Sequence, residues 1–288
     1  MDAQLAVTII LSTLMLSLGV SQSFQQLISL WRQPAILLRA LFAVIVLVPM
    51  TVVVLLWIFG LPPAIATGLA LLAAAPGAPM TAKRAEIAAA DIPYASSLQL
   101  TLGLLAVVVT PLTLAIFYAL FELTIESVSP IDVASQVVSV TFVPVVIGQL
   151  LLHFAPKFTA LIRKPLIILA NILLVVMVLG SVVLLWVTPE LQTALMLGWQ
   201  ATAAIVIMVV GALVIGHIIG GPRMVQRGAL ATAAVARNFG LALFITGLTE
   251  NGAASMMTLV VYLLVGVAIA TPYALWIRRQ VVASNEGD

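Results

Sequence analysis

Apolar runs long enough to cross a bilayer follow one another through almost the whole chain of 288 residues. A membrane-spanning helix needs about 20 predominantly apolar residues, and nine runs meet this requirement. They are residues 5–23, 35–58, 64–90, 94–121, 131–154, 166–187, 193–219, 224–248 and 253–277. Pro62, Pro130 and Pro189 stand at joints between runs, where a residue that cannot continue a helix is expected. The sequence therefore predicts an all-α integral membrane protein with nine transmembrane helices.

The composition supports this class and argues against several others. Hydrophobic residues make up 63% of the chain and charged residues only 8%, which no soluble domain of this length could present to water. Cysteine is absent, and the two histidines, His153 and His217, are far apart in sequence. We therefore expect no cofactor, no metal cluster and no paired nucleophile and base, so the chain is not predicted to be an enzyme. The basic residues are scattered between apolar runs, which indicates membrane topology and not nucleic-acid binding.

Basic and acidic residues occupy alternate connections between the runs. The basic connections contain Arg32, Arg39, Lys83, Arg84, Lys157, Arg163, Lys164, Arg223, Arg227, Arg278 and Arg279, and the acidic ones contain Glu122, Glu126, Asp132, Glu190 and Glu250. Short cytoplasmic loops retain basic residues. We therefore predict a multi-pass protein of the cell membrane with its amino terminus outside and its carboxyl terminus in the cytoplasm. Every basic residue except Arg237 is then expected on the inner face.

Two of the runs contain an interruption. The run 64–90 includes Pro76, Gly77 and Pro79, and the run 224–248 carries Arg237 near its middle. Roughly ten residues separate Arg227 from Arg237, which at about 1.5 Å per helical residue puts the guanidinium about 15 Å into the bilayer. An arginine at this depth costs about 3 kcal/mol on insertion scales. We therefore expect a buried partner, a wet cavity or a ligand beside it.

The interrupted runs are the third and the eighth, so five spans separate them. An odd offset reverses the direction of the chain across the membrane, and two broken spans in corresponding halves are typical of inverted-repeat transporters. We predict one transporter domain made of a four-helix repeat, 1–127, and a five-helix repeat, 128–288. Where the broken helices cross, free N–H and C=O groups lie at mid-depth, and the N-terminal helix ends attract anions.

A set of short motifs then resembles the bile acid:sodium symporter family. Residues 16–24 resemble its M-G-L-x-L-x-x-x-D-F stretch, Val48-Pro49 its next-helix proline, 75–78 its C/S-P-G-G, Asp91 its G-D aspartate, Thr110-Pro111 its T-P, and 237–242 its Q-N-S-G-L-A. Their order and ungapped spacing are shared, and the resemblance covers most of the chain. It implies a core domain with two crossed discontinuous helices, and a panel domain formed by the first, fifth and sixth spans.

The positions that bind sodium in this family are changed here. By the resemblance, a serine and an asparagine become Thr81 and Ala82, two hydroxyl residues become Ala95 and Gln99, a glutamate becomes Ala233, and two glutamines become Arg237 and Val44. Only Thr81, Gln99 and Asn238 keep polar side chains there. A site without its carboxylate and with a fixed cation should not bind sodium, because like charges repel strongly at low dielectric. We therefore expect sodium independence.

Two hypotheses describe Arg237. In the first, Arg237, aided by Lys83, replaces the bound sodium and attracts an anionic substrate. Hydrogen-bond donors would come from Asn238, Thr81, Gln99 and the exposed backbone N–H groups of the breaks, which contain the further site positions Pro76, Gly77 and Gly240. In the second, Arg237 is a structural plug that is bonded to the carbonyls of the broken helix and touches no substrate. For Lys83 the alternative is an inner-surface lysine, and Glu86, three residues on, is either its i,i+3 partner or a proton-coupling carboxylate.

The predicted function is transport of a small organic anion by alternating access, either secondary-active or facilitative. Two alternatives share the fold: a ligand-binding sensor without turnover, and a carrier closer to the auxin-efflux branch. The predicted partners are the lipid bilayer and a small organic anion, with no nucleic acid, and the sequence indicates no oligomeric state.

The predicted topology can be tested by labelling single cysteines introduced into this cysteine-free chain. Glu126→Cys and Glu190→Cys should react with an impermeant reagent in intact cells, because both positions are on predicted outer connections. Lys164→Cys should react only after permeabilisation. Labelling of Lys164→Cys in intact cells would contradict the nine-span topology.

Overall fold

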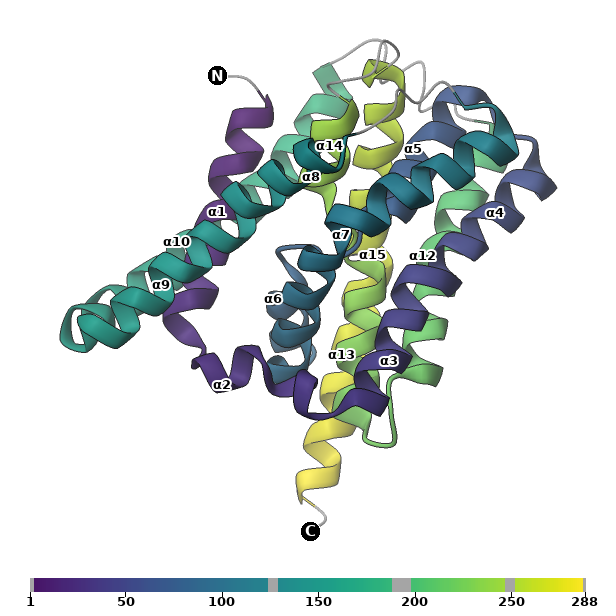
Figure 1. Cartoon of the computed structure of the whole chain (residues 1–288). Helices are drawn as coiled ribbons and strands as arrows, with labels where there is room; N and C mark the ends of the chain where they lie inside the picture. The colour runs from purple at the N-terminus through teal and green to yellow at the C-terminus, as the bar shows by residue number, and fades with distance from the viewer. Residues whose placement is uncertain (1–2, 124–128, 188–197, 247–251, 287–288) are drawn as a thin grey trace.

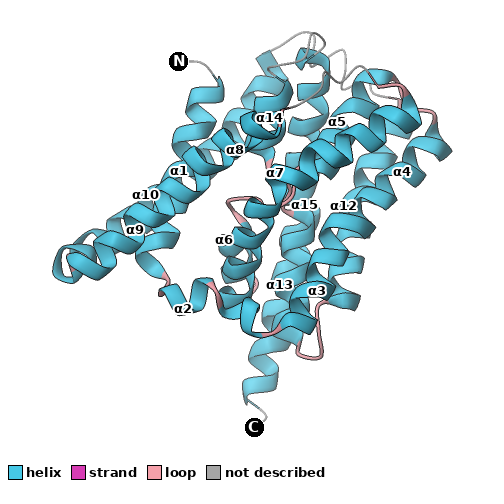
Figure 2. Ribbon diagram, in the orientation of Figure 1, coloured by secondary structure: helices cyan, strands magenta, loops and turns pink. Residues whose placement is uncertain are grey.

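The computed structural model describes residues 3–123, 129–187, 198–246 and 252–286, and these ranges are helical with short connections and no strand (Figure 2). Seven of the described helices are long and apolar enough to span a membrane. Two shorter apolar helices, Leu5–Ser21 and Pro63–Ala74, accompany them. The prediction of an all-α, multi-pass membrane protein is confirmed, while the count of nine spans stays a prediction.

The helices follow the predicted runs closely. They are α1 (Ala3–Ser21), α2 (Phe24–Leu27), η1 (Ser29–Arg32), α3 (Pro34–Leu41), η2 (Phe42–Leu47), α4 (Val48–Phe59), α5 (Pro63–Ala74), α6 (Thr81–Ile87), α7 (Ile92–Phe121), α8 (Pro130–Val137), η3 (Val138–Phe142), α9 (Val143–Phe154), α10 (Pro156–Val187), α12 (Trp199–Ile219), α13 (Met224–Val235), α14 (Phe239–Thr246) and α15 (Gly252–Glu286). The segments η2 and η3 are π-helical turns that join α3 to α4 and α8 to α9.

Some helix ends differ from the predicted ones. Helix α10 begins at Pro156, about ten residues before the predicted start, because a proline is well tolerated at the first helical position. Pro165 lies inside this helix and does not end it. Helix α15 continues past Arg278 and Arg279 to Glu286. The predicted outer residues Glu126, Glu190 and Glu250, the joint at Pro189 and the start of the run 193–219 lie outside the described residues.

Each π-helical turn comes directly before a Val-Pro pair. Proline has no N–H, and its ring clashes with the carbonyl four residues back, so the wider turn accommodates it. In η2, the N–H of Val48 donates to the carbonyl of Ala43, five residues back. The carbonyl of Val44 therefore loses its usual donor, Val48, and the residue five positions on is Pro49, which has no N–H. This leaves the Val44 carbonyl available to a donor from outside its own helix.

The two predicted interruptions are real breaks, and they meet each other. Residues 75–80 separate α5 from α6, and residues 236–238 separate α13 from α14. The backbone N–H of Asn238 in one break donates to the carbonyl of Ala75 in the other at 2.8 Å. The segment Met224–Thr246 is 94% buried over its most apolar stretch, against 11–44% for the six other candidate spans. The second broken helix therefore lies in the interior of the bundle.

The other helices surround the breaks in two groups (Figure 1). Helix α1 packs against α9 and α10 on one side, while α12 packs against α4, α13 and α15 on the other. Helix α5 packs against α7 and α15. The start of α1 and the end of α15 lie at opposite ends of the bundle.

Gly77 provides a test of how tightly the first break is packed. Its φ is +77°, and an added Cβ would lie 2.8 Å from the nitrogen of Gly103 in α7 and 2.9 Å from the Cβ of Leu102. We expect Gly77→Ala to lower the midpoint of thermal unfolding in detergent by at least about 3 °C, because both the conformation and the space disfavour a side chain.

The matched control is Gly180→Ala, since Gly180 lies in α10 and an added Cβ there meets no atom within 4 Å. This variant should unfold at or slightly above the wild-type temperature. Equal unfolding temperatures for both variants would contradict the packing of the break.

Candidate functional site

Arg237 is buried where the two breaks meet, with 3% of its surface exposed. Its Nε donates to the carbonyl of Leu72 at 2.8 Å, its Nη2 donates to the carbonyl of Ala73, and its Nη1 donates to the carbonyl of Val44 at 3.3 Å. Leu72 and Ala73 are in the last turn of α5, where helix carbonyls have no N–H partner within the helix. The guanidinium therefore caps the C-terminus of α5, and its charge lies at the negative end of the helix dipole.

The contact with Val44 connects this cap to a third helix. Its carbonyl is the one that the π-helical turn before Pro49 leaves without a donor in its own helix. A planar guanidinium can reach two carbonyls of α5 and one of η2 together, because its N–H groups are fixed in a fork. The buried partner that the sequence predicted for Arg237 is thus a set of backbone carbonyls, those of Leu72, Ala73 and Val44. We refer to this set and the guanidinium as the Arg237 carbonyl cluster.

Side chains also cap the other helix ends at the crossing. At the start of α6, Oε1 of Gln99 accepts a hydrogen bond from the N–H of Ala82 at 3.1 Å, and Nε2 of Gln99 donates to the sulfur of Met15. At the start of α14, Oδ1 of Asn238 accepts from the N–H of Leu241 at 3.1 Å. Both polar atoms of Gln99 and the Oδ1 of Asn238 are therefore used within the fold.

The C-terminus of α13 is capped by a residue that the sequence analysis missed. The hydroxyl of Tyr262, from α15, donates to the carbonyl of Val235 at 2.9 Å. No local signal identifies this role, because Tyr262 is 27 residues from its acceptor and is surrounded by apolar residues. Each of the four helix ends at the two breaks thus has a side-chain partner.

The remaining predicted positions divide into several groups. Thr81 is buried, and its hydroxyl donates to the carbonyl of Ala78 at 2.8 Å. Pro76 and Gly77 lie in the first break, and Gly240, in the first turn of α14, approaches Leu11 of α1 so closely that an added Cβ would collide with it. The four positions with apolar replacements are all buried: Val44, Ala82, Ala95 and Ala233.

Lys83 forms an ion pair with Glu86. Its Nζ is 2.7 Å from Oε2 of Glu86, so the i,i+3 ion pair is confirmed. Both residues line a cavity of about 200 Å³, the Lys83 cavity, with Ser17 of α1, Gln22 directly after it, and Arg163 and Asn171 of α10. Arg237 is not among the residues that line this cavity, and a role for Lys83 at a substrate site stays a prediction.

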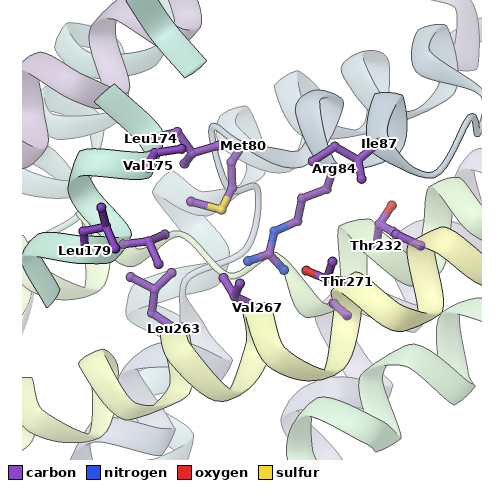
Figure 3. Close-up of a pocket in the computed structure, with 13 residues that line it drawn as sticks. Met80, Arg84, Ile87, Leu174, Val175, Leu179, Thr232, Leu263, Val267 and Thr271 are labelled. Carbon is purple, nitrogen blue, oxygen red and sulfur yellow. The ribbon is translucent and has the colours of Figure 1, made fainter. Parts of the chain in front are cut away.

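Arg84 lies beside a different cavity, and its placement on the inner face stays a prediction. Its side chain points into a second cavity between α6, α10, α13 and α15 (Figure 3). Its Nη1 is buried and has no hydrogen-bond partner among the described residues. Helical spacing could have revealed this direction, because Met80, Arg84 and Ile87 form one otherwise apolar stripe while Lys83 and Glu86 lie on another face.

A model of the sodium bile acid symporter family matches residues 8–186, which is more than half of the chain. The chain belongs to this family. No curated protein matches the chain. The match runs from α1 into α10 and includes the first break, while the second break with Arg237 lies beyond it. Membership in this family of transporters indicates a membrane transporter of the bile acid symporter type.

The Arg237 carbonyl cluster is the arrangement expected if Arg237 is a structural plug bonded to the carbonyls of the broken helix. This arrangement leads to a prediction about the stability of the protein. Arg237→Ala leaves buried carbonyls of α5 and η2 without donors, at a cost of about 2–5 kcal/mol. We expect its thermal unfolding midpoint in detergent to fall by about 5–15 °C. Arg237→Lys should fall less, since it keeps the charge but not the fork.

Arg39→Ala is the control, because Arg39 is an exposed arginine in α3. It should unfold within about 2 °C of wild type. An unchanged midpoint for Arg237→Ala would show that the carbonyl cluster contributes little to the fold.

Proposed function

We propose that this protein transports a small organic anion independently of sodium, with Arg237 as a fixed positive charge in place of a bound cation. The observation that carries this proposal is the use of the crossing's polar groups in internal hydrogen bonds. Arg237, Gln99 and Asn238 each satisfy a helix end at the breaks. Few oxygens are then left for a hard cation, which requires several oxygen ligands.

Electrostatics supports the same conclusion. A sodium ion at the breaks would lie near the guanidinium of Arg237, and two positive charges a few ångströms apart repel strongly in a buried site. The apolar side chains of Ala82, Ala95 and Ala233 supply no oxygen, and all three are buried. The fixed charge stabilises the end of α5, so no ion has to be bound to complete the crossing.

We further propose the architecture that the resemblance implies. Nine spans would form two inverted repeats, 1–127 and 128–288, with the amino terminus outside the cell membrane and the carboxyl terminus in the cytoplasm. The three-helix group of α1, α8–α9 and α10 would be the panel, and the helices around the breaks the core. The packing of α1 against α9 and α10 supports this division. Both cavities have walls from α10, in the proposed panel, and from α6, in the proposed core. Movement of the panel against the core would therefore change the access of a ligand to either cavity.

In this proposal Arg237 acts on the substrate at long range, without touching it. Its N–H groups point at carbonyls, so it would attract an anion through its charge and not through a direct fork contact. If the folded fraction of Arg237→Ala transports at the wild-type rate, this contribution is absent and Arg237 is structural only.

The sodium prediction can be measured on the purified protein without knowing its substrate. A ligand that binds only the folded state stabilises it by about 2.7 kcal/mol at a concentration one hundred times its Kd. A protein without a sodium site gains no such stabilisation from sodium. Replacing sodium chloride by potassium or choline chloride at constant ionic strength should therefore shift the unfolding midpoint by less than about 1 °C. A saturable, sodium-specific rise of several degrees would overturn the proposal.

Transport is tested in proteoliposomes with a radiolabelled organic anion selected by a thermal-shift screen. Initial uptake in sodium, potassium and choline should agree within about twofold, equivalent to roughly 0.4 kcal/mol. A sensor of the same fold would bind the anion without accumulating it. Steep sodium dependence of uptake would show that the backbone and Thr81 rebuild an ion site.

A further inference from the structure

The cavity that contains Arg84 is almost entirely apolar apart from this one cation. It has a volume of about 260 Å³ and lies between α6 and α10 on one side and α13 and α15 on the other. Met80, Leu174, Leu179, Leu263 and Val267 contribute apolar side chains to its wall (Figure 3). We refer to it as the Arg84 cavity.

The guanidinium of Arg84 enters this cavity without a protein partner. Its Nη1 is shielded from solvent and makes no hydrogen bond, and no described carboxylate forms an ion pair with it. Glu86, the nearest acidic residue in sequence, is paired with Lys83. A buried donor without an acceptor costs about 1–3 kcal/mol, so a ligand that accepts a hydrogen bond from this Nη1 would remove the cost.

Arg237 and Arg84 differ in this respect. Arg237 is buried and donates to three carbonyls, whereas Arg84 is half-buried and its Nη1 has no acceptor among the described residues. The hydroxyl of Thr271 lies on the guanidinium side of the cavity in Figure 3, and Thr271 also lines it. Thr232, across the cavity, donates its hydroxyl to the carbonyl of Gly228 in its own helix. The cavity thus offers one cation, one free hydroxyl and an apolar surface.

We propose that the Arg84 cavity binds a small amphipathic monoanion, a carboxylate or sulfonate with a compact apolar body. The anionic group would accept a fork of hydrogen bonds from Arg84, and the apolar body would pack on Met80, Leu263 and Val267. A single cation neutralises a single charge, so a dianion would leave one charge unpaired in an apolar site. The volume is slightly below the range of about 300–1,000 Å³ typical of small-molecule pockets, which favours a compact body.

This inference rests on the proposed function and deepens it by assigning the residue that recognises the anion. It also distinguishes Arg84 from Lys83, which carries the neighbouring positive charge. The charge of Lys83 is neutralised by Glu86 at 2.7 Å, so the unpaired charge available to an anion is that of Arg84. Because α10 forms one wall and α13 and α15 the other, a ligand in the cavity contacts both proposed moving parts.

The test is equilibrium binding of radiolabelled 4-phenylbutanoate to the purified full-length protein in detergent, by scintillation proximity. Wild type should bind it saturably, and Arg84→Met should weaken the affinity at least tenfold, with Arg84→Lys in between. The neutral analogue 4-phenylbutanol should bind wild type more weakly than the acid does, and its affinity should not fall in Arg84→Met. Arg39→Met, the exposed control, should bind the acid within twofold of wild type.

Protein stability provides an independent readout. Because Arg84 has no partner to lose, Arg84→Met should unfold at or above the wild-type temperature, in contrast to Arg237→Ala. The proposal is overturned if wild type does not bind the acid saturably or if folded Arg84→Met binds it normally. It is also overturned if Lys83→Met and not Arg84→Met removes binding, or if Arg84→Met is strongly destabilised.

The outcomes also separate this site from the transport proposal. Arg84-dependent binding without accumulation in proteoliposomes would contradict transport and leave the site standing. Uptake of the anion that persists in Arg84→Met would support transport and exclude this site.

Discussion

The contact between the Arg237 guanidinium and the end of α5 holds the centre of this protein together. A helix that ends inside a bilayer leaves carbonyls that water cannot reach, and each one costs free energy unless a donor is supplied. Arg237 supplies donors to Leu72 and Ala73 and places a positive charge at the negative end of the helix. The same side chain reaches Val44, so one residue joins the second broken helix to the first and to α3–α4.

The availability of Val44 depends on a proline several residues away. Pro49 requires a wider turn before it, and the resulting π-helical turn withdraws the usual donor of the Val44 carbonyl. A defect in one helix and a break in another are thus compensated by a single arginine. The other three helix ends at the two breaks follow the same rule with neutral caps from Gln99, Asn238 and Tyr262. In this family member, side chains complete the crossing, and this is the physical basis of the proposed sodium independence. A fixed charge cannot be released to either side of a membrane, so it cannot couple transport to an ion gradient.

Arg237 and Arg84 show how differently the same residue type can be used. Arg237 has its donors satisfied by the backbone, which makes its burial compatible with stability. Arg84 has a buried donor without an acceptor in an apolar cavity, which makes its burial costly unless an anion is bound. Their separation also means that a cation that stabilises the crossing and a cation that recognises a ligand need not be the same residue.

The sequence by itself determined the membrane class, most helix limits, both breaks and the burial of Arg237, because these follow from apolar length and from the local chemistry of proline and glycine. The family could also be recognised, since its motifs depend on local order and spacing. The tertiary structure decided which carbonyls Arg237 binds, that Arg84 and not Lys83 enters an apolar cavity, and that Gln99 and Tyr262 cap helices 17 and 27 residues from themselves. Helices that are apolar on every side carry little information about their rotation, so the partners across the bundle are fixed only when the helices pack.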